Sequence, residues 1–156
     1  MPSAADVAKF LAYLAQSGEE ADPLTNLRLQ KLLYYVQGWS LANRGIPMFP
    51  DQIEAWAHGP VVPDVYRQLS QFKSEQFVYE HEGEPTDFNM TDDERTFVSE
   101  VWEGYKPYSA LKLREMTHRE EPWINARKGF GPADRCSVEI TQEAMATFFT
   151  KLGQTE

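Results

Sequence analysis

The segment from Thr25 to Gly45 constrains the fold of this chain more than any other part of the sequence. Apolar residues recur in it at the spacing of one helix face. Thr25 is a typical N-cap residue, and Gly45 followed by Pro47 is typical of a helix end. The segment therefore predicts a central helix that runs to about Asn43. Its apolar stripe is Leu29, Leu32, Leu33 and Val36, widened by Tyr34, Tyr35 and Trp39.

Other segments repeat this combination of a start signal and helical periodicity. Helices are predicted to begin at or just after Ser3, Pro63, Thr91, Ser109, Pro122 and Thr141. A short strand is predicted over 53–57, with a turn at 58–60 and a weak extended partner over 77–79. The expected fold class is mainly α: a compact single domain over residues 1–156, with about six to seven helices and a minor short antiparallel β element.

The formal net charge of −9 is concentrated in one part of the chain. Residues 79–106 contain nine acidic and two basic residues, whereas residues 107–156 contain seven of each. An overall acidic chain argues against a nucleic-acid partner that is bound through its phosphates. The acidic segment is either a solvated loop followed by an acidic first helical turn, or a face that attracts a basic partner protein.

The sequence contains few signals that indicate the cellular compartment of the protein. Cys136 is the single cysteine, so no intramolecular disulfide forms, and a reducing compartment is expected. The first ten residues lack the basic start and apolar core of a signal peptide, and no apolar run approaches the length of a membrane span. We therefore expect a cytoplasmic protein without a membrane partner.

Catalytic motifs are missing from the sequence. It contains no phosphate-binding loop, dinucleotide fingerprint or zinc-protease motif, so no catalytic residue, cofactor or resident metal is predicted. Cys136 with His118 is a possible thiol–imidazole pair, but an idle or buried cysteine is the better interpretation. The alternative function is a metal-dependent hydrolase that uses His58, His118 and Glu121. Only His118 and Glu121 have the spacing of paired ligands in the sequence, whereas zinc needs three or four.

Two tryptophans stand apart from the periodic apolar faces. Trp56 and Trp123 each adjoin a turn that contains proline, where an aromatic ring can remain partly exposed to a partner. The competing interpretation is that both rings close the ends of the core.

Three blocks of sequence carry a resemblance to a known family. They are LTNLRLQKLLYYVQGWSLANRGIPMF from Leu24, IEAWAHGPVVPDVY from Ile53, and SALKLREMTHREEPW from Ser109. Together, in this order and spacing, they resemble the SocA-like antitoxins, the Panacea domain family, also described as phage-associated GepA-like proteins. In the first block, Gln30 and Lys31 are expected on the polar edge of the helix.

The resemblance implies a non-enzymatic antitoxin that neutralises a cognate protein toxin by direct binding. It also implies a further role as a proteolytic adaptor that delivers the bound toxin to the ClpXP protease. We expect the toxin to contact a set of turn and aromatic residues, with the acidic segment steering the encounter. That set is Trp56, His58, Gly59, Pro60, Tyr66, His118 and Trp123.

Overall fold

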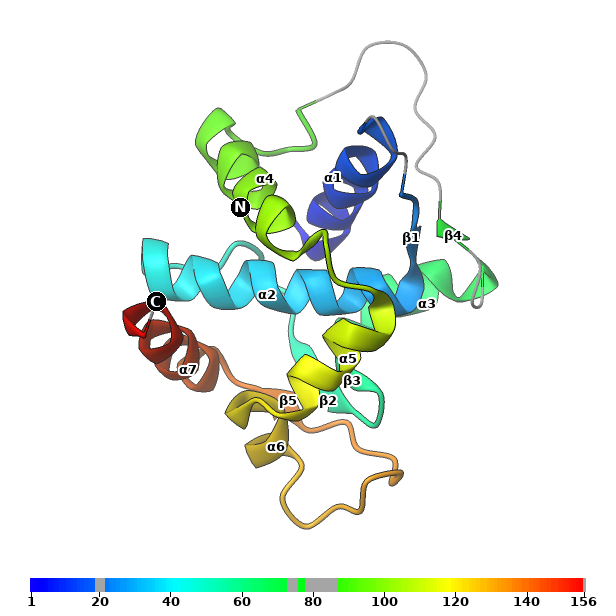
Figure 1. The fold of residues 1–156 in the computed structure, drawn as a ribbon, viewed down its shortest axis with the longest axis vertical. Coiled ribbons are helices and arrows are strands. Elements are labelled where there is room, and N and C mark those ends of the chain that lie inside the picture. The colour runs from blue at the N-terminus through cyan, green and yellow to red at the C-terminus, as the bar shows by residue number, and fades with distance from the viewer. Residues whose placement is uncertain (19–21, 73–75, 78–86, 156) are drawn as a thin grey trace.

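Helix α2 (Asn26–Arg44) crosses the middle of the molecule in the computed structural model, and the other helices pack around it (Figure 1). The structure describes residues 1–18, 22–72, 76–77 and 87–155. Thr25 caps α2 by accepting the Arg28 backbone N–H at 3.2 Å, and Gly45 ends the helix at a φ of 74°. The predicted central helix is therefore confirmed.

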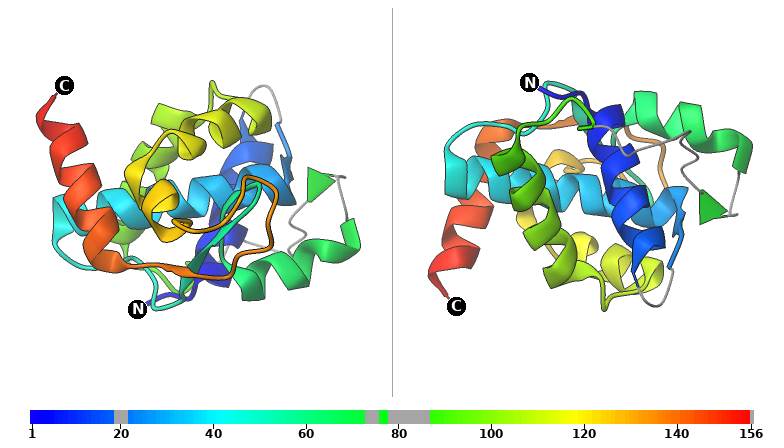
Figure 2. Two further views of the ribbon diagram at one scale, coloured as in Figure 1. Left: turned by 90° about the horizontal axis from the view of Figure 1, so that it is seen from below. Right: turned by 90° about the horizontal axis from the view of Figure 1, so that it is seen from above.

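Two groups of helices cover α2 from opposite sides (Figures 1 and 2). On one side lie α1 (Ala4–Ser17) and α4 (Asp92–Tyr105), and on the other lie α5 (Ala110–His118), α6 (Glu121–Ala126) and α7 (Gln142–Gln154). The short helix α3 (Pro63–Leu69) lies near the start of α2 and continues into the 3₁₀ turn η1 (Ser70–Phe72). The predicted caps Ser3, Thr91, Ser109 and Thr141 each accept a backbone N–H at a helix start.

The β structure of the described chain is small. Strands β2 (Ile53–Trp56), β3 (Gly59–Val61) and β5 (Glu139–Ile140) form an antiparallel sheet in the order β3-β2-β5, and β1 (Leu24–Thr25) pairs with β4 (Gln76–Phe77). The expectation of a mainly α fold with a minor antiparallel β element is confirmed.

Two predictions about these strands are wrong. The hairpin turn consists of Ala57 and His58 alone, because Gly59 already pairs with Trp56 and begins β3 together with Pro60. The extended segment at Phe77 pairs with β1 and not with the strand at 53–56. The rest of that predicted segment, Val78 and Tyr79, lies outside the described residues.

Helix α2 is buried on all its sides over most of its length. Its apolar stripe is fully buried, but Gln30 and Lys31 are also 0% exposed, so the expected polar edge does not exist. Neighbouring helices and the β2–β3 hairpin cover the face on which these two side chains lie. Polar side chains buried in this way need hydrogen-bond partners. Lys31 donates to Pro60 in the hairpin, whereas Gln30 donates to Asn26 in α2 and accepts from Val62, directly after β3.

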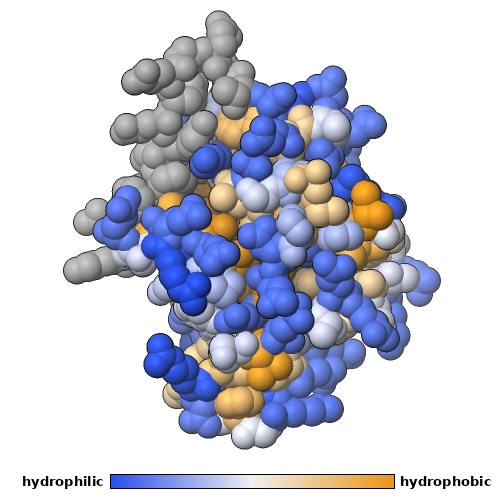
Figure 3. All heavy atoms as spheres, turned by 180° about the vertical axis from the view of Figure 1, so that it is seen from behind, coloured by the Kyte–Doolittle hydropathy of each residue, from blue (hydrophilic) through white to orange (hydrophobic). Residues whose placement is uncertain are grey.

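The surface is mostly hydrophilic, and apolar residues are exposed only in small separate patches on the face shown in Figure 3. Asp92, Asp93 and Glu94 occupy the first turn of α4, where they oppose the positive end of the helix dipole. The part of the acidic segment over 79–86 lies outside the described residues. No helix in the described ranges is long and apolar enough to cross a membrane.

Candidate partner-binding site

The β2–β3 hairpin brings three of the predicted contact residues into one cluster of rings. Trp56 ends β2, His58 forms the turn, and Tyr66 comes from the following helix α3. The Trp56 and Tyr66 ring centroids are 4.9 Å apart, and the His58 ring lies 5.9 Å from each. These three side chains, all half-buried, are called the hairpin surface below.

Three side chains from residues 118–127 hold the hairpin backbone from one side. The Trp123 indole N–H donates to the Trp56 carbonyl at 2.8 Å, and an Arg127 N–H donates to the Ala55 carbonyl at 2.9 Å. The His118 Nε2 lies 2.9 Å from the Ala57 carbonyl oxygen. Three successive carbonyl groups of the hairpin therefore each have a side-chain partner.

Side chains of helix α2 hold residues 60–66, which include the end of β3 and the start of α3, from the other side. The Lys31 ammonium donates to the Pro60 carbonyl at 3.1 Å, and the Gln30 amide oxygen accepts the Val62 backbone N–H at 2.9 Å. Asn26 donates to the Tyr66 carbonyl at 3.1 Å. All three side chains are buried, so these hydrogen bonds form in a medium of low dielectric constant.

Gly59 is required by this arrangement. Its φ is +119°, a conformation that side chains on L-residues rarely adopt, and a Cβ atom there would lie 2.5 Å from the Lys31 Cε. The glycine thus lets the hairpin lie directly on the buried lysine.

Burial, together with nearby positive charges, keeps the histidine of the hairpin neutral. Burial, reinforced by the nearby Arg114, lowers the pKa of Lys31 to about 7. Burial first, and then the positive charges of Lys31, Arg114 and His118, lower the pKa of His58 to about 4. A neutral His58 keeps one ring nitrogen as an acceptor. Its Nδ1 is buried and has no hydrogen-bond partner among the residues that the structure describes.

His118 is fully engaged by its own surroundings. Its Nδ1 lies 2.7 Å from the Arg114 carbonyl oxygen and its ring lies 4.0 Å from the Trp123 ring. Burial lowers the pKa of His118, whereas the two carbonyl contacts act in the opposite direction. Because both ring nitrogens face carbonyl oxygens, neither is available to a metal ion.

The predicted metal alternative therefore gains no support. Glu121, its third residue, is exposed at the start of α6. Within the described ranges, no group of three His, Cys, Asp or Glu side chains is placed to hold a metal ion.

The seven predicted contact residues differ in exposure. Trp56, His58, Tyr66 and His118 are half-buried, whereas Gly59 and Pro60 are buried in β3. Trp123 is only 8% exposed, so the expectation of a partly exposed ring is wrong for this residue. The hydrogen bond to Trp56 and the contact with His118 hold its ring in the core. Trp56 has the partial exposure that was expected.

Beside the hairpin surface lies a hollow of about 730 Å³. Trp56, His58 and Tyr66 form one wall, and residues of the 133–137 segment form another. Cys136 lines the hollow and is buried, at 4% exposed. The geometry thus offers a concave aromatic surface next to a hairpin whose backbone is held on two sides.

Sequence reasoning missed four of the six residues that hold the hairpin. Asn26 and Arg127 carry no recognisable motif signal. Gln30 and Lys31 were expected on the polar edge of the central helix, and no local signal shows that the hairpin covers them.

Comparisons with known proteins agree with the resemblance. The family model described as "Antitoxin SocA-like, Panacea domain" matches residues 29–124. The curated protein "Antitoxin SocA" of Caulobacter vibrioides (strain NA1000 / CB15N) is 50% identical over 48 residues, which are 31% of this chain and 26% of that protein. The match thus spans about a quarter of the relative's length. No solved structure matches the chain.

Proposed function

The chain belongs to the family of SocA-like antitoxins with a Panacea domain, and we propose that it neutralises a protein toxin by binding it directly through the hairpin surface. The binding involves no enzymatic step and takes place in the cytoplasm. The matched region contains the whole hairpin, α3, and the His118 and Trp123 side chains that hold the hairpin in place.

The fixed backbone of the hairpin is the observation that carries this proposal. Six side chains, from α2 on one side and from residues 118–127 on the other, form hydrogen bonds or close polar contacts with backbone atoms of residues 55–66. A surface that is already ordered loses little conformational entropy on binding, so more of its contact energy appears as affinity.

Each predicted contact residue has a role in this proposal. Trp56, His58 and Tyr66 touch the toxin, and large aromatic rings are the side chains that dominate binding energy at protein interfaces. Gly59 and Pro60 give the hairpin its path over Lys31, and His118 and Trp123 hold it from beneath.

The acidic segment has a steering role. Asp92, Asp93 and Glu94 lie at the start of α4, and the segment over 79–106 carries most of the excess negative charge. Surface charge of one sign raises the association rate with a partner of opposite charge more than it raises the final affinity. The association rate with a basic toxin should therefore fall as salt is added.

Co-expression with the product of the neighbouring gene tests direct neutralisation. We expect that product to stop growth alone, and this chain to restore growth and to co-purify with it. Trp56→Ala combined with Tyr66→Ala should abolish both effects while the melting temperature changes by only a few degrees. Ile46→Ala is the matched control, since Ile46 is an apolar residue that is 49% exposed elsewhere.

Two results would count against direct neutralisation at this surface. One is a double variant that is folded and still rescues growth. The other is a neighbouring product that is harmless when it is expressed alone.

We propose further that the bound toxin is passed to the ClpXP protease, as the family resemblance implies. The measurement is the half-life of purified toxin with ClpXP and ATP, with and without this chain. Acceleration by the unmodified chain, and its loss in the Trp56→Ala, Tyr66→Ala variant, is expected. An unchanged half-life of the toxin would mean that this chain neutralises the toxin by binding alone.

A further inference from the structure

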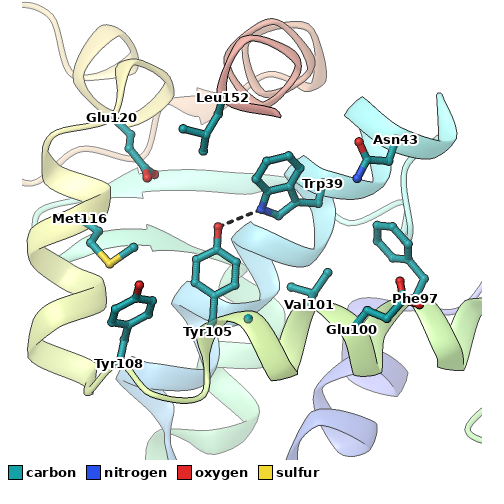
Figure 4. Close-up of a pocket in the computed structure, with 11 residues that line it drawn as sticks. Trp39, Asn43, Phe97, Glu100, Val101, Tyr105, Tyr108, Met116, Glu120 and Leu152 are labelled. Carbon is teal, nitrogen blue, oxygen red and sulfur yellow. Dashed lines mark hydrogen bonds between the residues drawn. The ribbon is translucent and has the colours of Figure 1, made fainter. Parts of the chain in front are cut away.

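A second concave surface lies between α2, α4, α5 and α7 (Figure 4). It has a volume of about 510 Å³ and shares no lining residue with the hollow beside the hairpin. Its walls include Trp39, Phe97, Tyr105, Tyr108, Met116 and Glu120, which together are called the aromatic groove. This groove is not part of the toxin-binding surface proposed above.

The Glu120 carboxylate points into the aromatic groove (Figure 4). The Tyr34 hydroxyl donates to one of its oxygens at 3.1 Å, and the Tyr35 hydroxyl donates to the other at 3.0 Å. A carboxylate has about four positions at which it accepts hydrogen bonds. Two such positions therefore remain for a group that enters the groove.

Burial raises the pKa of Glu120 to about 7, although the two tyrosine hydrogen bonds act in the opposite direction. The other titratable groups that face it are Tyr34 and Tyr35 from α2 and Tyr105, Tyr108 and Glu100 from the α4 side. Burying a carboxylate without a cation is unfavourable, and a cation brought close to it restores the charged form.

The groove contains no cation of its own. Its lining residues include Glu100 and Glu120 but no lysine, arginine or histidine. Within the described part of the chain, the five ion pairs that form do not involve either glutamate. A positively charged group from outside would thus meet only negative or neutral groups.

The rings of the groove suit a flat cation. Tyr105 is held in place by stacking on Tyr35 at 4.1 Å and by the Trp39 indole N–H, which donates to its hydroxyl at 2.8 Å (Figure 4). Tyr108, 37% exposed, lies 6.2 Å from Tyr105 between ring centroids. Arginine stacks on such faces and pairs with a carboxylate through two parallel N–H groups, which lysine cannot do.

We propose that the aromatic groove binds an arginine side chain, flanked by apolar residues, from a segment of a partner protein. The guanidinium pairs with Glu120 and stacks on the tyrosines, and the flanking residues cover Phe97 and Met116. This is an interaction surface in addition to the hairpin surface, and it stands whether or not the hairpin binds a toxin.

The test uses the full chain and three probe peptides: acetyl-Leu-Arg-Leu-amide, its lysine analogue, and the citrulline analogue, which keeps the shape of arginine without its charge. Binding is followed by NMR at the Trp39 indole N–H. The arginine peptide should bind at least about tenfold more tightly than the citrulline peptide, with lysine between them. This comparison requires no variant, so it is independent of any effect of mutation on folding.

Measurements on variants and at different pH values then show which carboxylate pairs with the arginine. Glu120→Gln should weaken binding of the arginine peptide about tenfold. Glu115→Gln, at an exposed position of α5 outside the groove, should leave this binding unchanged. Because the bound cation favours ionised Glu120, binding to the unmodified chain should tighten about tenfold between pH 6 and pH 8. Glu120→Gln should remove this pH dependence.

Three outcomes would overturn the proposal. They are equal affinity for the arginine and citrulline peptides, equal affinity of the unmodified and Glu120→Gln chains, and no shift of the Trp39 signal at millimolar peptide. A dimer of the unmodified chain in sedimentation that becomes a monomer in the Glu120→Gln chain would also overturn it, because the occupant would then be a second copy.

Discussion

The hairpin surface and the aromatic groove each lie beside one ionisable side chain, and the two side chains have opposite sign. Lys31 lies beneath the hairpin and donates to the Pro60 carbonyl, whereas Glu120 borders the groove and accepts from two tyrosines. The lysine is closed off by the hairpin at 0% exposure, while the half-buried glutamate points into the groove (Figure 4). Burial shifts both pKa values to about 7, from opposite directions.

This difference separates a structural charge from one that is available to a partner. The Lys31 ammonium serves the backbone of its own chain, and nothing from outside reaches it. Glu120 keeps free acceptor positions toward the groove. The segment from His118 to Trp123 connects the two regions, since its ends face the hairpin and its middle faces the groove.

The largest effect is expected from removing the lysine charge. Because the folded-state pKa of Lys31 is lowered, the unfolded chain binds more protons between pH 7 and 10, and stability rises with pH there. The free energy of unfolding of the unmodified chain, relative to Lys31→Met, should increase by about 3–4 kcal/mol over this range. Urea unfolding at several pH values measures it, and a constant difference would contradict the buried charge.

A methyl group added to the hairpin glycine should destabilise the chain nearly as much. Gly59→Ala combines a positive φ with a contact of 2.5 Å to Lys31, and a loss of about 3 kcal/mol is expected. Gly104→Ala is the control, because Gly104 lies within α4 with no atom near the added methyl, and it should be neutral or stabilising. Thermal unfolding of both variants decides whether the hairpin really lies on the lysine.

The glutamate should give a pH dependence of opposite sign. The raised folded-state pKa of Glu120 means that the folded chain retains a proton that the unfolded chain loses between pH 4.5 and 7, so stability falls as pH rises through this range. Over this pH range, the free energy of unfolding of the unmodified chain, relative to that of Glu120→Gln, should fall by about 2–3 kcal/mol. If the difference instead grew with pH, Glu120 would be an ordinary stabilised carboxylate.

The smallest effects are expected when either of two tryptophans is replaced by phenylalanine. Trp123→Phe removes the hydrogen bond to the Trp56 carbonyl, and Trp39→Phe removes the one to the Tyr105 hydroxyl. Each should cost about 1 kcal/mol beyond the lost ring packing. The first should weaken toxin binding, measured by co-purification. The second should weaken binding of the arginine peptide, measured by calorimetry because this variant lacks the Trp39 indole N–H. Crossed effects would show that residues 118–123 couple the two surfaces.

Helix positions were predictable from the sequence because caps and periodicity are local signals. Ser3, Thr25 and Thr91 were each identified as helix starts, and each side chain caps its helix. The sheet was not predictable in the same way. Whether the segment at Phe77 pairs with Leu24 or with Ile53 depends on how distant helices pack, and a two-residue turn at 57–58 leaves Gly59 in a strand.

The candidate site was predictable only in part for the same reason. Trp56 and His58 could be selected as residues at a turn, and Tyr66 as an aromatic residue of the following helix, and the three lie together. Lys31 was expected in solvent because a charged residue in an amphipathic helix usually lies there, and nothing local shows that a hairpin covers it. Glu120 lies two residues before the predicted helix start at Pro122, and its two tyrosine partners are 85 and 86 residues away in sequence.

The polar contacts that hold the hairpin all go to main-chain atoms and not to polar atoms of the side chains that it displays. Substitution at Trp56, His58 or Tyr66 therefore leaves the carbonyl and amide positions that Asn26, Gln30, Lys31 and their counterparts require. A library randomised at the displayed positions should consequently retain the architecture while its binding preferences diverge. Such a division allows one scaffold to be retargeted to new proteins, by selection in the laboratory or over evolutionary time, without rebuilding its interior.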